Sequence, residues 1–576
     1  MRTSCKLTTD VLVVGSGFSG FWAAMTAREH VQDVLIVDKG PRDWGGIGYL
    51  SGGDLFAMTP DMDREKLLDE LVYFYDGLCD QEVLEDILDE SYDRFTAYER
   101  MGHEFVRDAN GKLMGIPQRG LEHMCCFHSK PYGKGGGNFT RELVREVEKR
   151  DIRRIGRIMI TDVVKNGDTV CGAVGFFTQS GRPVYIEAKA VILTTNIGGW
   201  KCSYLANSMA SGAAELALNA GVALRNCEFL MVWNLPKLFS WEGQTGLLPK
   251  GACFRNALGE DFMQRYSPRY GAKADPHYNV RGMAHEVREG RGPIYFDTSA
   301  MSPQDVQIMR PKGGWMKLND DKLMALGINF FRQKTEWMPQ YVHSFGGMNV
   351  NRDYGTGVPG LYAAGRACSV DPGVYLGGWS LCVVAVSGFK VGHLAGRYAA
   401  SASHQAYDQP LAQELAGRRL SRLGRPGLPP KDVVRALQEI MAPVDVCILK
   451  SGVGLSRSLD KLMSLRAEVL GRMVASDPQQ LVKCVEAEGI ADLTEAYLRS
   501  SLMRKESRSG HYREDFPDRD PDGPYWILAE RSRNEMTSRI VRVPVETYRI
   551  QPYKYYMDAF NFPRKKDGES IYKTND

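Results

Sequence analysis

The first segment whose residue types and spacing could do chemistry is residues 15–20, GSGFSG, which has the glycine spacing G-x-G-x-x-G. A β-branched run at residues 10–14 precedes it and a helical pattern follows it. In this context Gly15 permits a tight turn, and Gly17 lets the backbone approach a pyrophosphate at the N-terminus of the helix. Asp38 ends the next buried run and can accept hydrogen bonds from ribose hydroxyls. The motif therefore predicts a dinucleotide site rather than a chance glycine turn.

Three later segments extend this site and favour FAD over NAD. Residues 40–53 follow the second predicted strand and carry six glycines, so the backbone there can pass beside an isoalloxazine ring. A buried run ends at Thr194-Thr195 and is followed by Gly198 and Gly199. Residues 358–365, VPGLYAAG, form a further buried strand and lead into residues 375–381, YLGGWSL.

The order of these segments resembles the flavoprotein subunit family of fumarate reductase, succinate dehydrogenase, L-aspartate oxidase and adenylylsulfate reductase. VPGLYAAG and LGGWSL are similar to that family's second FAD segment. Its capping-domain and C-terminal landmarks resemble NALGEDF at 256–262, GRGPIYFD at 290–297 and RKESRSGHYREDFP at 504–517. The resemblance covers about residues 8–520. It implies an α/β protein with a Rossmann-like FAD-binding domain, an inserted α+β capping domain and a C-terminal helical domain.

The patterning along the 576 residues agrees with this organisation. An irregular stretch that mixes tryptophan, proline and charged residues interrupts the α/β pattern, and a helix-rich stretch follows it. The expected parts are a FAD-binding domain in two pieces, 1–226 and 339–405, a capping domain at 227–338, a helical domain at 406–510 and a polar, aromatic tail at 511–576.

The resemblance also implies which residues bind FAD. The predicted cofactor-binding residues are Gly15, Gly17, Phe18, Ser19, Gly20, Asp38, Lys39, Gly45, Gly46, Gly52, Gly53, Thr194, Thr195, Gly365, Arg366, Ser380 and Leu381. Residues 44–53 contain no histidine, whereas covalently flavinylated members of the family have one in this stretch, so we expect non-covalent FAD. Arg366 stands where the family has an acid after AAG, and this substitution changes the expected contact with the ribitol chain.

Arg281 and His343 are the candidates for substrate chemistry. Arg281 matches the place of the capping-domain arginine that donates a proton in fumarate reductases, and a guanidinium can polarise an acceptor or bind an oxyanion. A structural ion pair is the alternative. His343 begins the sequence HSFGG, which resembles the family's H-x-x-GG element. Its imidazole could donate to a substrate carboxylate or shuttle a proton; a histidine satisfied in the core is the alternative.

Two departures from the family argue against a simple dicarboxylate substrate. Trp233 or Asn234 replaces a histidine, and Tyr375 replaces an arginine that clamps a substrate carboxylate. Without a bidentate arginine a carboxylate is poorly paired. Trp233 and Tyr375 therefore indicate a more aromatic or less charged substrate, unless they only repack the wall of the site.

The leading hypothesis is a flavin-dependent reductase or dehydrogenase that transfers hydride between flavin N5 and a small organic molecule. Electrons would be exchanged with a separate partner. The resemblance suggests a ferredoxin-like iron–sulfur subunit, because this chain has 12 cysteines but no C-x-x-C spacing. The alternatives are sulfur-oxyanion chemistry like that of adenylylsulfate reductase, and an oxidase that uses O₂. A non-catalytic FAD scaffold is the least favoured.

Charge and composition limit the other function classes. Lysine and arginine total 73 against 70 acids, so the net charge of +3 gives no signal for nucleic acid or a membrane surface. No stretch reaches the ~18 apolar residues of a membrane span, and we expect a cytoplasmic protein. His123, Cys125, Cys126 and His128 lie too close together for one tetrahedral metal site, so no metal is expected. Oligomeric state and substrate identity stay open.

Overall fold

The chain is described by a computed structural model that covers residues 4–118, 120–130, 135–202, 207, 209–210, 212–238, 247–308, 315–370, 373–532 and 535–563. Its Rossmann-like domain is built on a sheet in the order β6-β2-β1-β9-β8-β7, with β16 also paired to β9. The strands are β1 (Cys5–Val14), β2 (Val34–Val37), β6 (Arg153–Ile155), β7 (Ile158–Asn166), β8 (Thr169–Phe177), β9 (Pro183–Leu193) and β16 (Leu361–Ala363). β7, β8 and β9 form the antiparallel meander, whereas β6, β2, β1, β9 and β16 run parallel.

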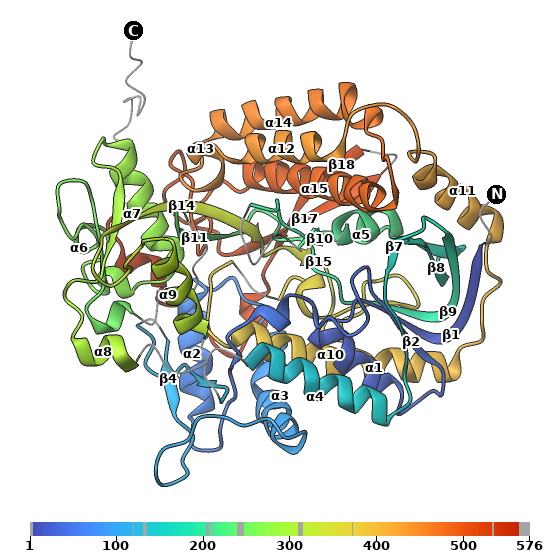
Figure 1. Cartoon of the computed structure of the whole chain (residues 1–576), viewed down its shortest axis with the longest axis horizontal. Helices are drawn as coiled ribbons and strands as arrows, with labels where there is room; N and C mark the ends of the chain where they lie inside the picture. Colours follow the sequence, from blue (N-terminus) through green and yellow to red (C-terminus); the bar gives the residue numbers. More distant parts are fainter. Residues whose placement is uncertain are drawn as a thin grey trace.

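Helix α1 (Phe18–Ala27) is buried along its whole length, because α10 (Trp379–Ser401) and α4 (Gly135–Lys149) both pack against it (Figure 1). Gly388 and Gly392 lie one turn apart on α10, and a Cβ at these positions would come within 2.5 Å of Ser19 O and 1.9 Å of Thr26 Oγ1. The two helices can therefore approach closely. Within the described residues α10 alone is long and apolar enough to meet the criteria for a membrane span, and 61% of that window is buried inside the protein.

The inserted capping domain has its own sheet, in the order β11-β14-β13-β12, and its own hydrophobic core around Phe254, Phe296 and Trp337. Figure 1 shows its green helices standing to one side of the Rossmann-like domain. Strand β14 runs across the expected boundary at residue 338. The elements are β11 (Leu230–Pro236), β12 (Cys253–Arg255), α6 (Met263–Tyr266), α7 (Pro276–Arg288), β13 (Ile294–Asp297), α8 (Pro303–Ile308), α9 (Trp315–Ala325) and β14 (Thr335–Ser344).

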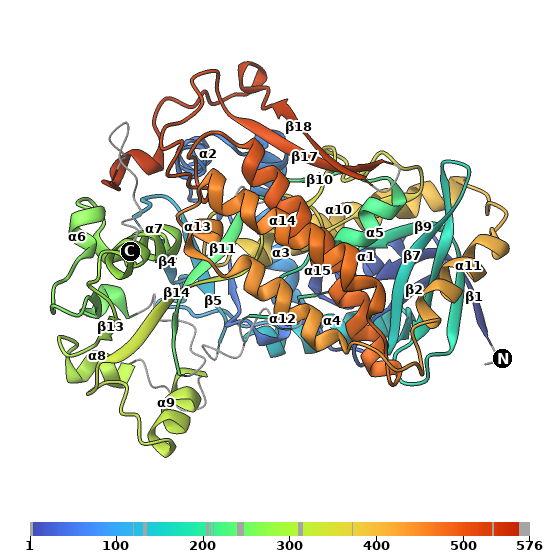
Figure 2. The ribbon, with the colours of Figure 1, turned by 90° about the horizontal axis from the view of Figure 1, so that it is seen from above.

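The helical domain stacks α12, α14 and α15 into one layer, as Figure 2 shows from above. Its helices are α11 (Gln409–Leu420), α12 (Pro430–Met441), α13 (Val444–Cys447), α14 (Gly452–Glu468) and α15 (Pro478–Met503). The tail then forms a hairpin of β17 (Tyr525–Ser532) and β18 (Glu535–Arg542), where the sequence predicted a single strand. The predicted fold class, with its capping and helical domains, is confirmed.

Smaller elements complete the Rossmann-like domain and connect it to the tail. A three-stranded sheet, β3-β5-β4, follows the glycine segment at residues 45–53, and β10 pairs with both β15 and β17. These elements are β3 (Asp54–Leu55), α2 (Arg64–Phe74), α3 (Gln81–Arg100), β4 (Gly115–Pro117), β5 (Cys125–His128), α5 (Ala213–Ala220), β10 (Leu224–Arg225) and β15 (Gly347–Met348).

Candidate active site

The first glycine motif forms a tight turn that leaves the N-terminus of α1 open on one side. Gly15 has φ 114°, and a Cβ there would lie 2.8 Å from Thr194 Oγ1. A Cβ at Gly20 would lie 2.0 Å from the carbonyl oxygen of Gly15. A Cβ at Gly17, by contrast, would meet no described heavy atom within 4 Å. The open face at Gly17, at the N-terminus of a helix, is suited to an anionic group such as a pyrophosphate.

The end of β2 is held to this turn by a side chain. The Asp38 carboxylate accepts hydrogen bonds from Ser16 N at 2.7 Å, from Ser16 Oγ at 3.0 Å and from Gly40 N at 2.6 Å. Lys39, predicted to contact the cofactor, donates from Nζ to Glu486 at 2.8 Å on α15. Asp38 and Lys39 therefore fix the chain around the site, and their contacts to a ribose stay predictions.

The second glycine segment lies directly beside the first. Gly45 forms a parallel bridge with Gly17, and a Cβ at Gly46 would lie 3.3 Å from Gly17 Cα. Further along, a Cβ at Gly53 would lie 2.3 Å from Gly135 Cα. The glycines at the start of α4 thus let this helix touch the backbone of residues 48–53. Gly133, which belongs to the same glycine-rich stretch, lies outside the described residues.

The third and fourth segments close the cradle at the carboxyl ends of β9 and β16. Thr194 Oγ1 donates to Val14 O at 2.9 Å and to Gly15 O at 3.0 Å, which joins β9 to the first turn. A Cβ at Gly365 would lie 2.6 Å from Ser19 Oγ on α1. Ser380 and Leu381 lie in the first turn of α10. Four distant stretches of the chain thus meet at one edge of the sheet, where ligands bind in doubly wound folds.

A second group of side chains lies next to this edge. His343, on β14, forms an isolated bridge with Gly199, just beyond the end of β9. On the neighbouring strand β11, Met231 pairs with His343, and Trp233 lies two residues further along. The rings of Trp233 and Tyr375 meet edge to face, with centroids 5.0 Å apart. Trp233, His343 and Tyr375, which are distant in sequence, are therefore brought together beside the cradle by β11, β14 and the segment before α10.

Comparison with protein families identifies this architecture. The family described as "FAD binding domain" matches residues 10–381, and the family described as "Fumarate reductase flavoprotein C-term" matches residues 434–556. The chain belongs to the FAD-binding flavoprotein family of fumarate reductase and succinate dehydrogenase. It is therefore an FAD-dependent oxidoreductase, as the sequence predicted.

Several named proteins are similar to this chain. The chain is 29% identical to one of the subunits of the CoM/CoB fumarate reductase of Methanothermobacter marburgensis, over 91% of this chain and 97% of that one. It is 24% identical to the L-aspartate oxidase of Pseudomonas aeruginosa, over 90% and 97%. In structure it resembles a mutant FrdA protein of the Escherichia coli quinol fumarate reductase, with a TM-score of 0.85, 21% identity and 96% and 99% coverage.

Two features of the cradle of this flavoprotein are suited to bind FAD. Gly17 leaves room for the pyrophosphate, as described above. The hydroxyl oxygen of Thr195 is buried and has no hydrogen-bond partner among the described residues. A buried hydroxyl without a partner costs about 1–3 kcal/mol, and a polar atom of the cofactor would satisfy it. Among the described side chains of the cradle, Thr195 therefore gives the most direct indication of a ligand.

His343, which lies beside the cradle, has a defined tautomer. Its Nδ1 lies 2.8 Å from the carbonyl oxygen of Ser344, which can only accept, so Nδ1 carries the proton. Burial, and then the nearby Arg366 guanidinium, lower the pKa of His343 to about 3. The ring is therefore neutral at physiological pH and presents the lone pair of Nε2. This arrangement accepts a hydrogen bond and does not donate one to a carboxylate.

Arg281 lies on α7 but directs its guanidinium towards the C-terminal part of the chain. Its Nη2 donates to Ser509 O at 2.7 Å, and the guanidinium lies over the rings of Tyr278 and Tyr512 at 4.6 and 5.1 Å. The side chain is almost completely buried. These contacts tie the capping domain to the C-terminal landmark, and the predicted catalytic role of Arg281 stays a prediction.

The start of α7 brings two further residues to the edge, which the sequence interpretation did not single out. Asp275 caps the helix and accepts from Tyr375 N at 3.3 Å. His277 bonds to the same carboxylate through Nδ1 at 2.6 Å and to Leu230 O through Nε2 at 2.9 Å. The sequence signal was present, since an aspartate followed by proline at the first helical position is a typical helix start.

Two other constellations near the cradle do not form separate active sites. His103 bridges Glu142 and Ser129, which looks like a hydrolase triad, but Ser129 Oγ donates to Gly53 O at 2.6 Å and all three side chains are buried. This relay instead fixes the second glycine segment. The cysteines 125 and 126 lie on one strand, β5, whose successive side chains point to opposite faces. They therefore do not converge on one ligand.

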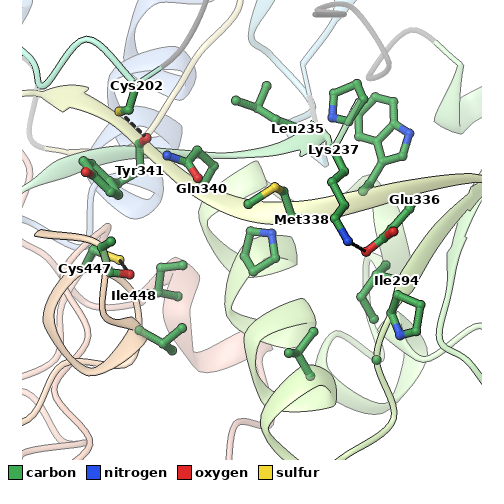
Figure 3. A pocket seen from close by; sticks show the side chains of 18 of the residues that line it. Cys202, Leu235, Lys237, Ile294, Glu336, Met338, Gln340, Tyr341, Cys447 and Ile448 are labelled. Carbon is green, nitrogen blue, oxygen red and sulfur yellow. Dashed lines mark hydrogen bonds and ion pairs between the residues drawn. The ribbon is translucent and has the colours of Figure 1, made fainter. Parts of the chain in front are cut away.

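An open cleft of about 1170 Å³ lies at the outer ends of the strands that carry Trp233 and His343 (Figure 3). Its walls come from β11, β14 and the end of α7 in the capping domain, and from α12 and α13 in the helical domain. Among its lining residues, Lys237 and Glu336 form an ion pair at 2.8 Å, and Cys202 Sγ donates to Tyr341 O at 3.1 Å. The cleft thus lies between the capping and helical domains.

Proposed function

We propose that this flavoprotein reduces an unsaturated organic molecule, or oxidises its saturated form, and that the molecule is not a simple dicarboxylate. The observation that carries this proposal is the edge-to-face pair of Trp233 and Tyr375. The pair stands where the family resemblance expects a histidine and a carboxylate-binding arginine. When bound, FAD supplies the hydride chemistry through N5.

The chain's own residues would bind and orient the substrate. Trp233, Tyr375 and Phe345 belong to one apolar cluster, which also includes Ile47 from the second glycine segment. This cluster offers flat apolar surface and excludes water. The lone pair of His343 Nε2 would accept a hydrogen bond from a hydroxyl or N–H group of the substrate. The expected substrate class is therefore an aromatic or apolar molecule with an activated double bond and a polar donor group.

In this proposal Arg281 acts as a positioning residue. The contacts of its guanidinium with Ser509, Tyr278 and Tyr512 support that role. Arg281→Lys tests it. A positioning role predicts reduced turnover with a raised KM and FAD still bound, whereas complete loss of turnover with unchanged substrate binding would return Arg281 to the reacting centre.

We further propose that electrons reach the flavin from a separate iron–sulfur protein. Two matched relatives are named as subunits, which supports a multi-protein arrangement. Trp44 and Tyr49, on the second glycine segment, stack at 5.4 Å and are 39% and 45% exposed. Such an exposed aromatic pair near the flavin offers a contact surface for a redox partner.

One screen separates the candidate functions. The FAD-loaded protein is reduced without oxygen, and flavin absorbance is followed after addition of unsaturated acids, unsaturated ketones, sulfur oxyanions or air. Reoxidation by an apolar enone or enoate supports the proposal. Rapid reoxidation by air with release of peroxide would favour the oxidase, and bleaching by sulfite that AMP reverses would favour sulfur-oxyanion chemistry. The Arg366 guanidinium beside His343 is the observation that keeps this last candidate in the screen.

A further inference from the structure

The last described residues, 556–563, lie across the junction between the Rossmann-like and capping domains, and we name them the C-terminal strap (Figure 1, dark red beside the green capping domain). The family match at the C-terminus ends at Tyr556, so nearly all of the strap extends beyond it. Phe562 packs against both the main hydrophobic core and the separate core of the capping domain. The strap therefore joins two cores that are otherwise distinct clusters.

On the Rossmann-like side, the strap contacts the last residue of α2 and the segment that follows it. The ring of Tyr556 packs on Phe74 with centroids 4.8 Å apart. Met557 N donates to Asp76 Oδ1 at 3.1 Å. Tyr556 is completely buried, so this end is anchored in the core of the domain.

On the capping side, the strap follows α7 from its first turn to its last. Tyr556 Oη accepts from the N–H of Asp275, the N-cap residue, at 3.3 Å. Phe560 stacks on Tyr278 with centroids 3.8 Å apart and an interplanar angle of 12°. Phe562 stacks on His285 at 5.8 Å. Three aromatic residues of the strap thus contact the N-cap, the first turn and the last turn of one helix.

This helix reaches the substrate edge through Asp275, whose carboxylate accepts from Tyr375 N. The chain of contacts therefore runs from the strap to Asp275 and on to the backbone of Tyr375. A capping domain joined to its neighbour by short segments is free to move unless its interface holds it. Aromatic stacking between the strap and α7 adds to the apolar area that this interface buries.

We propose that the C-terminal strap fixes the capping domain in the position that it has in this structure, against the Rossmann-like domain, with Tyr556, Phe560 and Phe562 as positioning residues. The strap reaches the substrate edge through α7, where the ring of Phe562 also lies 5.8 Å from the Arg281 guanidinium. Its effect does not depend on which substrate the protein uses, so the proposal stands or falls separately from the proposed function.

The test compares FAD-loaded variants by hydrogen exchange of the α7 amides and by iodide quenching of flavin fluorescence. Removal of residues 555–576 should raise α7 exchange and the quenching constant by on the order of tenfold, because the capping domain loses this anchor. Removal of residues 564–576 alone should change neither. Phe562→Ala should give part of the effect. Phe562→Tyr keeps the ring, so its exchange and quenching should equal those of the full chain. Tyr553→Ala, at a residue that is 68% exposed, is the matched control.

Two outcomes would overturn the proposal. The first is a folded, FAD-loaded protein without the strap whose α7 exchange and flavin quenching equal those of the full chain. If that truncation does not fold, Phe562→Ala decides, and exchange in α7 no faster than in Tyr553→Ala would be the second. A melting curve for each variant distinguishes opening of the capping domain from global loss of stability.

Discussion

The cofactor cradle and the substrate edge lie side by side but are built in different ways. The cradle consists of backbone turns at Gly15, Gly45 and Gly365, where absent side chains make room. The proposed substrate edge consists of large side chains, Trp233 and Tyr375, brought together from different domains. A cofactor shared by a whole family can be bound by backbone geometry, whereas the choice of substrate depends on side chains that each member can replace.

The largest effect is expected from a substitution that adds one methyl group to the first turn of the cradle. In Gly20→Ala the new Cβ would lie 2.0 Å from Gly15 O, a backbone atom that cannot move without opening the turn. We expect FAD affinity to fall by more than about 100-fold. The ratio of flavin to protein absorbance after purification measures this loss. Gly417→Ala, in α11, is the matched control because a Cβ there meets nothing within 4 Å, and FAD loss in that variant too would remove the steric explanation.

The next effect is at the substrate edge. His343→Ala removes the Nε2 acceptor, and we expect the rate of flavin reoxidation by the true substrate to fall about 10²-fold while FAD stays bound. Stopped-flow absorbance of the reduced flavin gives this rate. A variant that reoxidises as fast as the natural protein would exclude His343 from the chemistry.

The pH dependence of stability gives a second test of His343. The folded-state pKa of His343 is about 3 and the unfolded value is about 6.5. Between these values the unfolded chain binds the extra proton, so His343 contributes stability above pH 6.5 and that contribution is lost as pH falls towards 3. His343→Gln should therefore lose less stability on acidification than the natural protein. Parallel melting curves from pH 7 to pH 4.5 would show this, and equal slopes would contradict it.

A smaller effect is expected from a substitution that makes the substrate edge resemble the rest of the family. Tyr375→Arg places a guanidinium where the resemblance expects the carboxylate clamp. We expect flavin reoxidation by fumarate to rise about tenfold while reoxidation by apolar acceptors falls. No change in this ratio, in a folded and FAD-loaded variant, would mean that Tyr375 does not face the substrate.

The smallest effect concerns a single hydroxyl in the cradle. Thr195→Val removes the buried oxygen that has no partner among the described residues. If FAD supplies that partner, the dissociation constant should rise about 3- to 10-fold, as measured by fluorescence titration. Thr178→Val is the control, because the hydroxyl of Thr178 is likewise buried and unpartnered in the described structure but lies in the meander at the end of β8. A tighter complex in Thr195→Val would contradict the assignment.

The cradle could be predicted from the sequence because its motifs are local. The motif at residues 15–20, the glycines at 45–53 and VPGLYAAG each encode a turn by themselves, and the family and fold they predicted are confirmed. The substrate edge was harder, because its geometry arises from packing. The direction of Arg281, the role of Asp275 and the tautomer of His343 all depend on contacts with Ser509, Tyr375 and Ser344, which no spacing in the sequence reveals.

The pairing of β16 with β9 has a consequence for the synthesis of the protein. β9 also pairs with β1, so the last strand of the cradle is added only after the whole capping domain has been made. At about 5–20 residues per second, the first glycine turn waits tens of seconds for its distant partner. During that time residues 191–193 at the end of β9 lack their β16 partner, and FAD has no complete binding site. We therefore expect FAD to be loaded late in biogenesis, after the end of β9 has gained its β16 partner.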